Sequence, residues 1–334
     1  MRQNRFLASD PTSKPRLIGV IGIIASTLLF LSIAIYGFTQ RQSILPTTGI
    51  TIPGLPTQPL ITCTTPQHTP GDTPGSIIST GQRRTLLVHL PPGYGVQPEP
   101  LVILYHGYSW TSQIMEHNST MAAESDRAGF VLVFPQGLDS PPSWNAGVGT
   151  GDADDIQFTR DLLSYLEKNY CVDRHRVYLS GFSLGGGMAY RLACTLTDQI
   201  AAVATVSGAY YPLQEGCHPS RPIPVMEIHG AADPLAPYAG NADIGMAGMR
   251  NYLNGWLERD QCDTTSEVFF QQGDVTGIQW THCAPGVAVV HYRVSDGLHT
   301  WPGTPHTTHV IDAGVVIWQF FSRYSLALDS ESSD

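Results

Sequence analysis

The chain has 334 residues, of which 42% are hydrophobic and 14% charged, and its formal net charge is −10. This length accommodates one domain of roughly 250 residues with smaller segments beside it. The acidic balance argues against nucleic acid as a partner, because nucleic-acid binding requires clustered Lys and Arg. The 33 glycines and 25 prolines predict many turns and a Pro-rich linker, and not a collagenous or disordered chain.

The first predicted element is an uncharged run at residues 17–38, "LIGVIGIIASTLLFLSIAIYGF", long enough to cross a membrane core of about 30 Å. Four cations precede the run and only Arg41 follows it closely, which places residues 1–16 in the cytoplasm and the remainder outside. A cleaved signal peptide is the alternative, but the run is longer than the usual apolar core of a signal and no clear A-x-A site follows it. We therefore expect an uncleaved transmembrane signal-anchor and a protein at the cell surface, or a secreted protein if the segment is cut.

Residues 39–75 are dominated by Pro and Thr and predict an extended, semi-rigid linker. Residues 76–326 form the predicted catalytic domain, and residues 327–334 are expected to be a disordered tail. Short apolar runs predict strands at 83–90, 100–107, 130–137, 176–181, 200–209, 223–230 and 287–294. Helical signals occur at 113–129, 154–170, 184–197, 248–260 and 310–324. This alternation is typical of an α/β fold with a mostly parallel sheet and helices on both faces.

The stretch "GFSLG", residues 181–185, is a G-x-S-x-G motif between a predicted strand and a predicted helix. This context is typical of a nucleophile elbow, a sharp turn that lifts the hydroxyl of Ser183 above the sheet. A Cβ at Gly181 or Gly185 would collide with neighbouring chain, and the helix N-terminus supplies partial positive charge. The alternative is a glycine-rich turn without chemistry, because the pentapeptide alone occurs often by chance.

A serine hydroxyl becomes a nucleophile near pH 7 only when a base takes its proton and an acid orients that base. On this type of turn the chain order is serine, acid, histidine. Asp233 lies in the loop after the strand at 223–230, where a turn aspartate before proline is the alternative. His299 lies in a loop after the strand at 287–294, with His306 and His309 as rivals and His291 inside the strand.

A developing oxyanion requires two backbone N–H groups aimed at one point. Leu184, directly after the serine, is the candidate for one of them. In "LYHGYSW" the pair His106-Gly107 allows a tight turn, and Tyr108 is the candidate for the other. We interpret His106 itself as a capping or core histidine.

Five stretches together resemble a known group of proteins: "HGYSW", "WNAG", "YCVDRHRVYLSGFSLGGGMAYRLAC", "HGAADPLAPY" and "GLHTWPG". They are similar to the secreted serine esterases grouped with polyhydroxybutyrate depolymerases and feruloyl esterases. The resemblance runs from about Cys63 to the C-terminus. It implies an α/β-hydrolase fold, carboxylic ester hydrolysis and a triad of Ser183, Asp233 and His299. Many relatives have a polar residue where Leu184 stands and a small or polar one where Tyr108 stands, which puts the shape of the acyl pocket in doubt.

An even number of cysteines, six, in a chain with an export segment favours disulfides over scattered core thiols. The resemblance implies a pair of Cys262 with Cys283, flanking two paired strands, and a pair of Cys194 with Cys217, which leaves Cys63 with Cys171. Fifteen pairings are possible for six cysteines.

Trp144 in "SWNAG" and Trp301 in "HTWPG" lie in motif loops near the expected mouth of the site. Aromatic faces there would suit the planar ring of a phenolic ester or a sugar-linked ester. The alternative is that both indoles pack against the loops.

We therefore predict an extracytoplasmic serine carboxylic ester hydrolase that works as a monomer without metal or cofactor. Its substrate is expected to be a polyester or oligomer such as polyhydroxybutyrate, or a feruloyl or acetyl ester of plant polysaccharide. The alternative is a catalytically silent, envelope-anchored binding or scaffold protein with the same fold. The complete Ser–Asp–His order argues against that alternative.

Overall fold

The computed structural model describes Cys63 and residues 68–327. The chain divides into two units, Met1–Pro59 and Leu60–Asp334, and the described residues all belong to the second. The predicted membrane segment at 17–38, most of the predicted linker and nearly all of the predicted tail lie outside the described residues. Within the described part of the chain, no helix combines the length and the apolar character needed to span a membrane.

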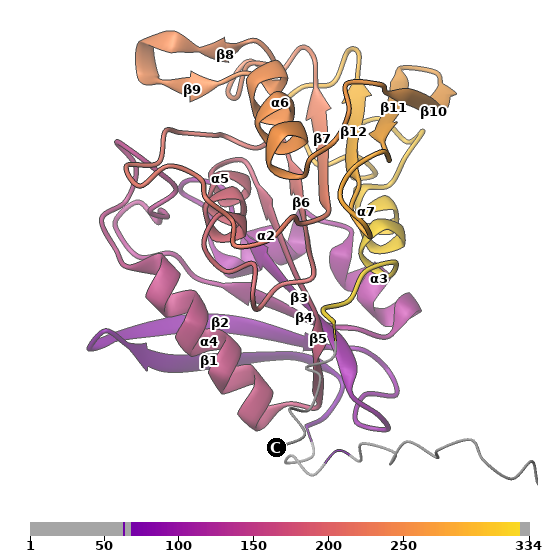
Figure 1. Cartoon of the computed structure of the whole chain (residues 1–334). Helices are drawn as coiled ribbons and strands as arrows, with labels where there is room; N and C mark the ends of the chain where they lie inside the picture. Colours follow the sequence, from indigo (N-terminus) through magenta and orange to yellow (C-terminus); the bar gives the residue numbers. More distant parts are fainter. Residues whose placement is uncertain (1–62, 64–67, 328–334) are drawn as a thin grey trace, which may run out of the picture. The chain divides into compact units, whose positions relative to one another are not determined.

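A ten-stranded sheet runs through the domain, and its six central strands are parallel. In spatial order these strands are β4 (Val131–Pro135), β3 (Glu99–Tyr105), β5 (Val172–Phe182), β6 (Ala202–Val206), β7 (Val225–Gly230) and β12 (Val289–Val294) (Figure 1). Antiparallel pairs extend both edges: β2 (Gln82–Leu90) with β1 (Gly71–Ser79), and β11 (Val275–Trp280) with β10 (Glu267–Gln272). The mostly parallel sheet predicted from the sequence is confirmed.

Helices cover both faces of the sheet, because side chains alternate between two hydrophobic cores along each central strand. On β3, for example, Leu101, Ile103 and Tyr105 belong to one core, and Val102 and Leu104 to the other. The first core also contains residues of α4 (Asp155–Asn169), α5 (Leu184–Ala193) and α6 (Met249–Arg259). The second contains residues of α2 (Ser112–His117), α3 (Met121–Ala128) and α7 (Ala313–Phe321). A small excursion between β7 and α6 comprises β8 (Gly240–Asn241), η1 (Ala242–Ile244) and β9 (Met246–Ala247).

Two elements differ from the sequence-based expectations. The helix predicted at 113–129 is two helices, α2 and α3, separated by residues 118–120. Strand β1 begins at Gly71, inside the predicted linker, because its backbone pairs along the whole length of β2. The β10–β11 hairpin is the strand pair that the resemblance implies between Cys262 and Cys283, and its outer strand is an exposed sheet edge.

Three disulfides join Cys63 to Cys171, Cys194 to Cys217 and Cys262 to Cys283. These are the pairs that the family resemblance implies. The first closes a loop of 108 residues and ties Cys63 to the residue that precedes β5. Disulfides of this kind persist in oxidising compartments, which fits an extracellular protein.

Candidate active site

Ser183 occupies a strained turn between β5 and α5, where its backbone has φ 57° and ψ −122°. A side-chain-bearing residue in such a region costs about 1–3 kcal/mol and persists only where its surroundings hold it. The Ser183 N–H donates to Val206 O (3.0 Å), and the Ser183 carbonyl accepts from the N–H groups of Gly187 (3.1 Å) and Ala209 (3.0 Å). Neighbouring β6 and the loop after it therefore fix the turn in this conformation.

The glycines on either side of Ser183 allow the chain to pack closely at the turn. A Cβ at Gly181 would overlap the carbonyl group of Gly185, and a Cβ at Gly185 would overlap the carbonyls of Tyr105 and His106. The strand, the turn and the start of α5 thus approach one another within backbone contact distance, as the sequence predicts.

We expect Gly185→Ala to destabilise the protein by more than about 3 kcal/mol, because backbone atoms and not flexible side chains obstruct the added methyl group. Thermal unfolding followed by circular dichroism measures this loss. Gly75→Ala is the matched control, since a Cβ there meets only the Leu86 side chain at ordinary contact distances of 3.4–3.8 Å. Equal melting temperatures of the two variants would contradict the steric account.

Asp233 and His299 form a hydrogen-bonded pair at the ends of β7 and β12. His299 Nδ1 lies 2.7 Å from Asp233 Oδ2, and Asp233 Oδ1 accepts the backbone N–H groups of Leu235 and Ala236, both at 2.8 Å. Burial alone would raise the pKa of Asp233, but the hydrogen bond and charge of His299 and the two backbone donors outweigh it and lower that pKa. The carboxylate therefore stays ionised near neutral pH, and it orients His299 with Nδ1 toward the acid.

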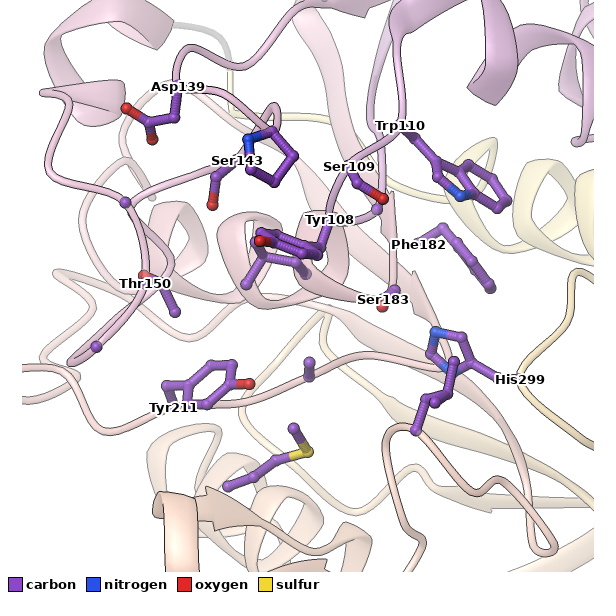
Figure 2. Close-up of a pocket in the computed structure, with 18 of the residues that line it drawn as sticks. Tyr108, Ser109, Trp110, Asp139, Ser143, Thr150, Phe182, Ser183, Tyr211 and His299 are labelled. Atoms are coloured by element: carbon purple, nitrogen blue, oxygen red, sulfur yellow. The ribbon is translucent and has the colours of Figure 1, made fainter.

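Ser183 and His299 line the same pocket, which has a volume of about 840 Å³. Figure 2 shows the imidazole of His299 pointing toward Ser183, with the Phe182 ring beside both. The rings of Phe182 and His299 lie 4.9 Å apart between centroids, so Phe182 packs against the imidazole. The structure thus places Ser183 and His299 in one pocket, with Asp233 hydrogen-bonded to His299.

Two backbone N–H groups lie beside Ser183 without an acceptor among the described residues, those of Tyr108 and Leu184. Leu184 is the first residue of α5, where N–H groups have no partner within the helix. Tyr108 follows the carboxyl end of β3, and both residues line the pocket. Both predicted donor residues therefore line the same pocket as Ser183.

His106 fixes the direction of the Tyr108 N–H. Its Nε2 accepts the N–H of Gly137 (2.9 Å), so its Nδ1 carries the proton and donates to Gly107 O (2.8 Å). In a trans peptide the carbonyl of Gly107 and the N–H of Tyr108 point in opposite directions, so holding one aims the other. Burial lowers the pKa of His106 to about 4, which keeps the ring neutral in this role. His106 is a core histidine, as interpreted from the sequence.

Trp144 and Trp301, the predicted substrate contacts, are not among the residues that line the pocket. Trp144 is fully buried, and its indole N–H donates to His106 O (2.8 Å). Trp301 is 3% exposed, and its indole N–H donates to Thr120 Oγ1 (3.1 Å). Both indoles are therefore buried in the domain, and each N–H has a hydrogen-bond acceptor there.

Other aromatic residues surround the pocket. Its aromatic lining consists of Tyr108, Trp110, Phe182 and Tyr211 (Figure 2). Trp110 stacks on Phe182 at 5.0 Å between ring centroids, and it belongs to the stretch "HGYSW". That stretch could have pointed to Trp110, whereas no feature of the sequence distinguishes Tyr211.

The comparisons with known proteins agree with this geometry. Residues 95–259 match the family profile described as Phospholipase/Carboxylesterase. The chain is also 31% identical over 257 residues to "Putative esterase NocK" of Nocardia uniformis subsp. tsuyamanensis, covering 68% of this chain and 73% of that protein. The chain belongs to the esterase family of this relative. The strand–serine–helix turn, the central parallel sheet and the order of Ser183, Asp233 and His299 along the chain are those expected of an α/β-hydrolase fold.

The chain spans less than half of the length of two further relatives. Feruloyl esterase B of Piromyces equi is 30% identical over 73% of this chain, and the match spans 46% of that protein. The bifunctional acetylxylan esterase/xylanase XynS20E of Neocallimastix patriciarum is 28% identical over 74% of this chain, which is 34% of its own length. Among solved structures, an acetyl xylan esterase from Aspergillus awamori superposes with a TM-score of 0.56 at 15% identity, covering 75% of this chain and 99% of that one. That superposition shows the shared fold.

Proposed function

We propose that the protein is a serine carboxylic ester hydrolase, with Ser183 as nucleophile, His299 as general base and acid, and Asp233 as the residue that orients His299. The observation that carries the proposal is the 2.7 Å hydrogen bond between Asp233 and His299 in a pocket that His299 shares with a strained Ser183. Strain at a residue flanked by close-packed glycines is typical of a functional turn. Three disulfides support an extracytoplasmic location.

The reaction proceeds in two halves. Ser183 Oγ attacks the ester carbonyl while its proton passes to His299 Nε2, and the oxyanion that forms accepts hydrogen bonds from the N–H groups of Tyr108 and Leu184. His299 then gives the proton to the leaving alcohol, and an acyl-enzyme on Ser183 remains. Water, deprotonated by His299, attacks the acyl carbon and releases the acid. Asp233 remains a carboxylate throughout and stabilises the imidazolium form of His299.

The acyl part of the substrate is proposed to be a hydroxycinnamoyl or acetyl group carried on plant polysaccharide. The aromatic lining at Tyr108, Trp110, Phe182 and Tyr211 supports a planar acyl group, and relatives named as feruloyl and acetylxylan esterases support the same class. Hydrolysis of methyl ferulate, acetylated xylan and 3-hydroxybutyrate oligomers by the purified full chain tests this. Activity confined to the hydroxybutyrate oligomers would reject the polysaccharide esters in favour of a polyester.

The charge of the pocket predicts a preference for uncharged esters. Asp139 is the only Asp or Glu among the lining residues, which include no Lys or Arg, and it is exposed to solvent. A substrate with a free carboxylate meets repulsion there that water weakens but does not abolish. We expect Asp139→Asn to raise kcat/KM for the p-nitrophenyl monoester of succinic acid by about 2–5-fold and to leave p-nitrophenyl butyrate unchanged.

The same measurement in 1 M NaCl is the control. Salt at that concentration screens the Asp139 charge, so the two proteins should then hydrolyse the anionic ester at equal rates. An equal gain for the neutral and the anionic ester would show that the substitution reshapes the pocket and does not act through charge.

A further inference from the structure

A second acid–histidine pair lies directly beneath Asp233, fully buried and unused by the mechanism above. Glu227 and His229 are neighbours on the same face of β7, and neither side chain is exposed to solvent. His229 Nδ1 lies 2.7 Å from Glu227 Oε1, and His291 of β12 lies opposite, with its Nδ1 3.0 Å from Glu227 Oε2. Burying such groups costs several kcal/mol unless they are paired, so their retention at this position requires an explanation.

The other nitrogen of His229 contacts the loop that carries Asp233. Its Nε2–H donates to Ala236 O (2.7 Å), because a carbonyl oxygen can only accept, and Nε2 also lies 3.6 Å from Asp233 Oδ2. The N–H of the same residue, Ala236, donates to Asp233 Oδ1. His229 therefore binds the carbonyl of Ala236, and the N–H of Ala236 in turn binds the carboxylate of Asp233.

Both ring nitrogens of His229 face acceptors, the carboxylate of Glu227 and the carbonyl of Ala236. Burial would lower the pKa of His229, but the charge and hydrogen bond of Glu227 and the Ala236 carbonyl raise it. Burial would raise the pKa of Glu227, but the facing histidines lower it. The two acceptors and both pKa directions favour an imidazolium–carboxylate pair, with the His229 ring on the side of Asp233.

Tyr238 and the two N–H donors to Asp233 complete the contacts around the buried pair. Tyr238, in the same loop as Ala236, forms a hydrogen bond to His291 Nε2 (2.8 Å), and its ring meets that of His229 edge to face at 5.8 Å. Asp233 Oδ1 is occupied by two N–H groups, so Oδ2 is the oxygen left for His299. A shift of the loop at Ala236 would turn the carboxylate and misplace His299.

We propose that His229, anchored by Glu227, is a positioning residue that holds the loop 233–236 so that Asp233 Oδ2 faces His299. This inference rests on the proposed function of the triad. His229 touches neither substrate nor Ser183; it acts through the Ala236 carbonyl and the charge next to Asp233.

Two amide substitutions separate the positioning role from a general effect on stability. In His229→Asn the side-chain amide can replace Nδ1 toward Glu227 but is too short to reach Ala236 O. In His229→Gln the amide can replace Nε2 toward Ala236 O. We expect His229→Asn to lower kcat for p-nitrophenyl acetate by about 10–100-fold with KM within twofold, because small errors in catalytic geometry cost rates of this size. His229→Gln should keep kcat within about fivefold of the wild type even if its melting temperature falls further.

The control is His89→Asn, the same change at another buried histidine. His89 lies on β2 and forms hydrogen bonds to the carboxylates of Asp72 and Asp126. Its kcat should equal that of the wild type. The proposal is overturned if folded His229→Asn keeps kcat within twofold, or if His229→Gln loses as much activity as His229→Asn. Should His229→Asn not fold, Glu227→Gln/His229→Leu removes the same donor without leaving an unpaired carboxylate, and the same expectation applies.

A measurement that does not use activity separates this inference from the proposed function. Hydrogen exchange of the Leu235 and Ala236 amides, which donate to Asp233, should be at least tenfold faster in His229→Asn than in the wild type. Faster exchange in His229→Asn, combined with a wild type that hydrolyses no ester, would support the positioning role and reject the proposed function. If the wild type hydrolyses esters and the two amides exchange at the same rate in His229→Asn, the positioning role alone is overturned.

Discussion

Ser183→Ala should lower kcat for p-nitrophenyl acetate by about 10⁵-fold while the protein stays folded. The alanine removes the only atom that forms the acyl-enzyme, and the remaining triad residues then have no nucleophile to activate. The backbone of residue 183 donates to Val206 O and accepts from the N–H groups of Gly187 and Ala209 regardless of the side chain, so the melting temperature should change little. Steady-state hydrolysis with matched thermal unfolding curves provides the measurement. A folded variant that retains wild-type turnover would reject Ser183 as nucleophile.

Asp233→Asn should lower kcat by about 10⁴-fold, for a reason specific to the contacts of this carboxylate. Oδ1 accepts two backbone N–H groups, so the amide carbonyl of an asparagine must take that position and its NH₂ must face His299. His299 Nδ1 would then have to accept a hydrogen bond, which moves the ring proton to Nε2, the nitrogen facing Ser183. A ring with that tautomer cannot take the serine proton.

The matched control for Asp233→Asn is Asp161→Asn on α4. Asp161 is also a hydrogen-bonded aspartate, accepting from Ser79 Oγ (2.6 Å) and Gln157 Nε2 (2.8 Å), but it does not line the pocket. Its substitution should leave kcat within about twofold of the wild type. If the two substitutions reduced kcat equally, the tautomer explanation would be wrong.

Short-range sequence patterns predicted the turn that carries Ser183 and the loops that carry Asp233 and His299. The collision argument for Gly181 and Gly185 requires only a strand followed directly by a helix, and the structure has that turn. The order of serine, acid and histidine gave Asp233 and His299, because each follows a strand recognisable from its apolar run. The structure brings these three residues together, and their catalytic roles are the proposal tested above.

The lining of the pocket could not be predicted in the same way, because long-range packing decides it. Trp144 has an acceptor 38 positions away in the carbonyl of His106, and this hydrogen bond places the indole inside the domain. Trp301 is held by Thr120, a residue 181 positions earlier. Neither contact leaves a local signal in the sequence, so the sequence does not distinguish a buried tryptophan from one that lines the pocket.

The split helix has a similar cause. Thr120 lies between α2 and α3, where its hydroxyl donates to Asp312 Oδ1 (2.5 Å) and accepts from the Gly314 N–H (3.0 Å). Asp312 is the N-cap of α7, so this contact joins the break between α2 and α3 to the start of the last helix. The helical pattern at 113–129 continues through the break, and tertiary hydrogen bonds override it.

The inferred role of His229 illustrates a limit of reading function from motif order alone. The stretch "EIHGAADP" contains both the second acid–histidine pair and Asp233, and only the side-chain geometry shows that His229 holds Ala236 and does not act as the base. His291, inside β12, belongs to the same buried group. The histidine that faces Ser183 is identified by the pocket, which His299 lines and the other two do not.

Covalent labelling of Ser183 tests the central proposal most directly. The purified full chain and its Ser183→Ala variant are treated with diisopropyl fluorophosphate, digested and analysed by mass spectrometry. The account predicts one phosphoryl adduct, located on Ser183 in the wild type and absent from the variant, and slower labelling in Asp233→Asn. A folded wild type without an adduct, or with an adduct on another serine, would contradict the account and favour a binding or scaffold protein that shares the fold.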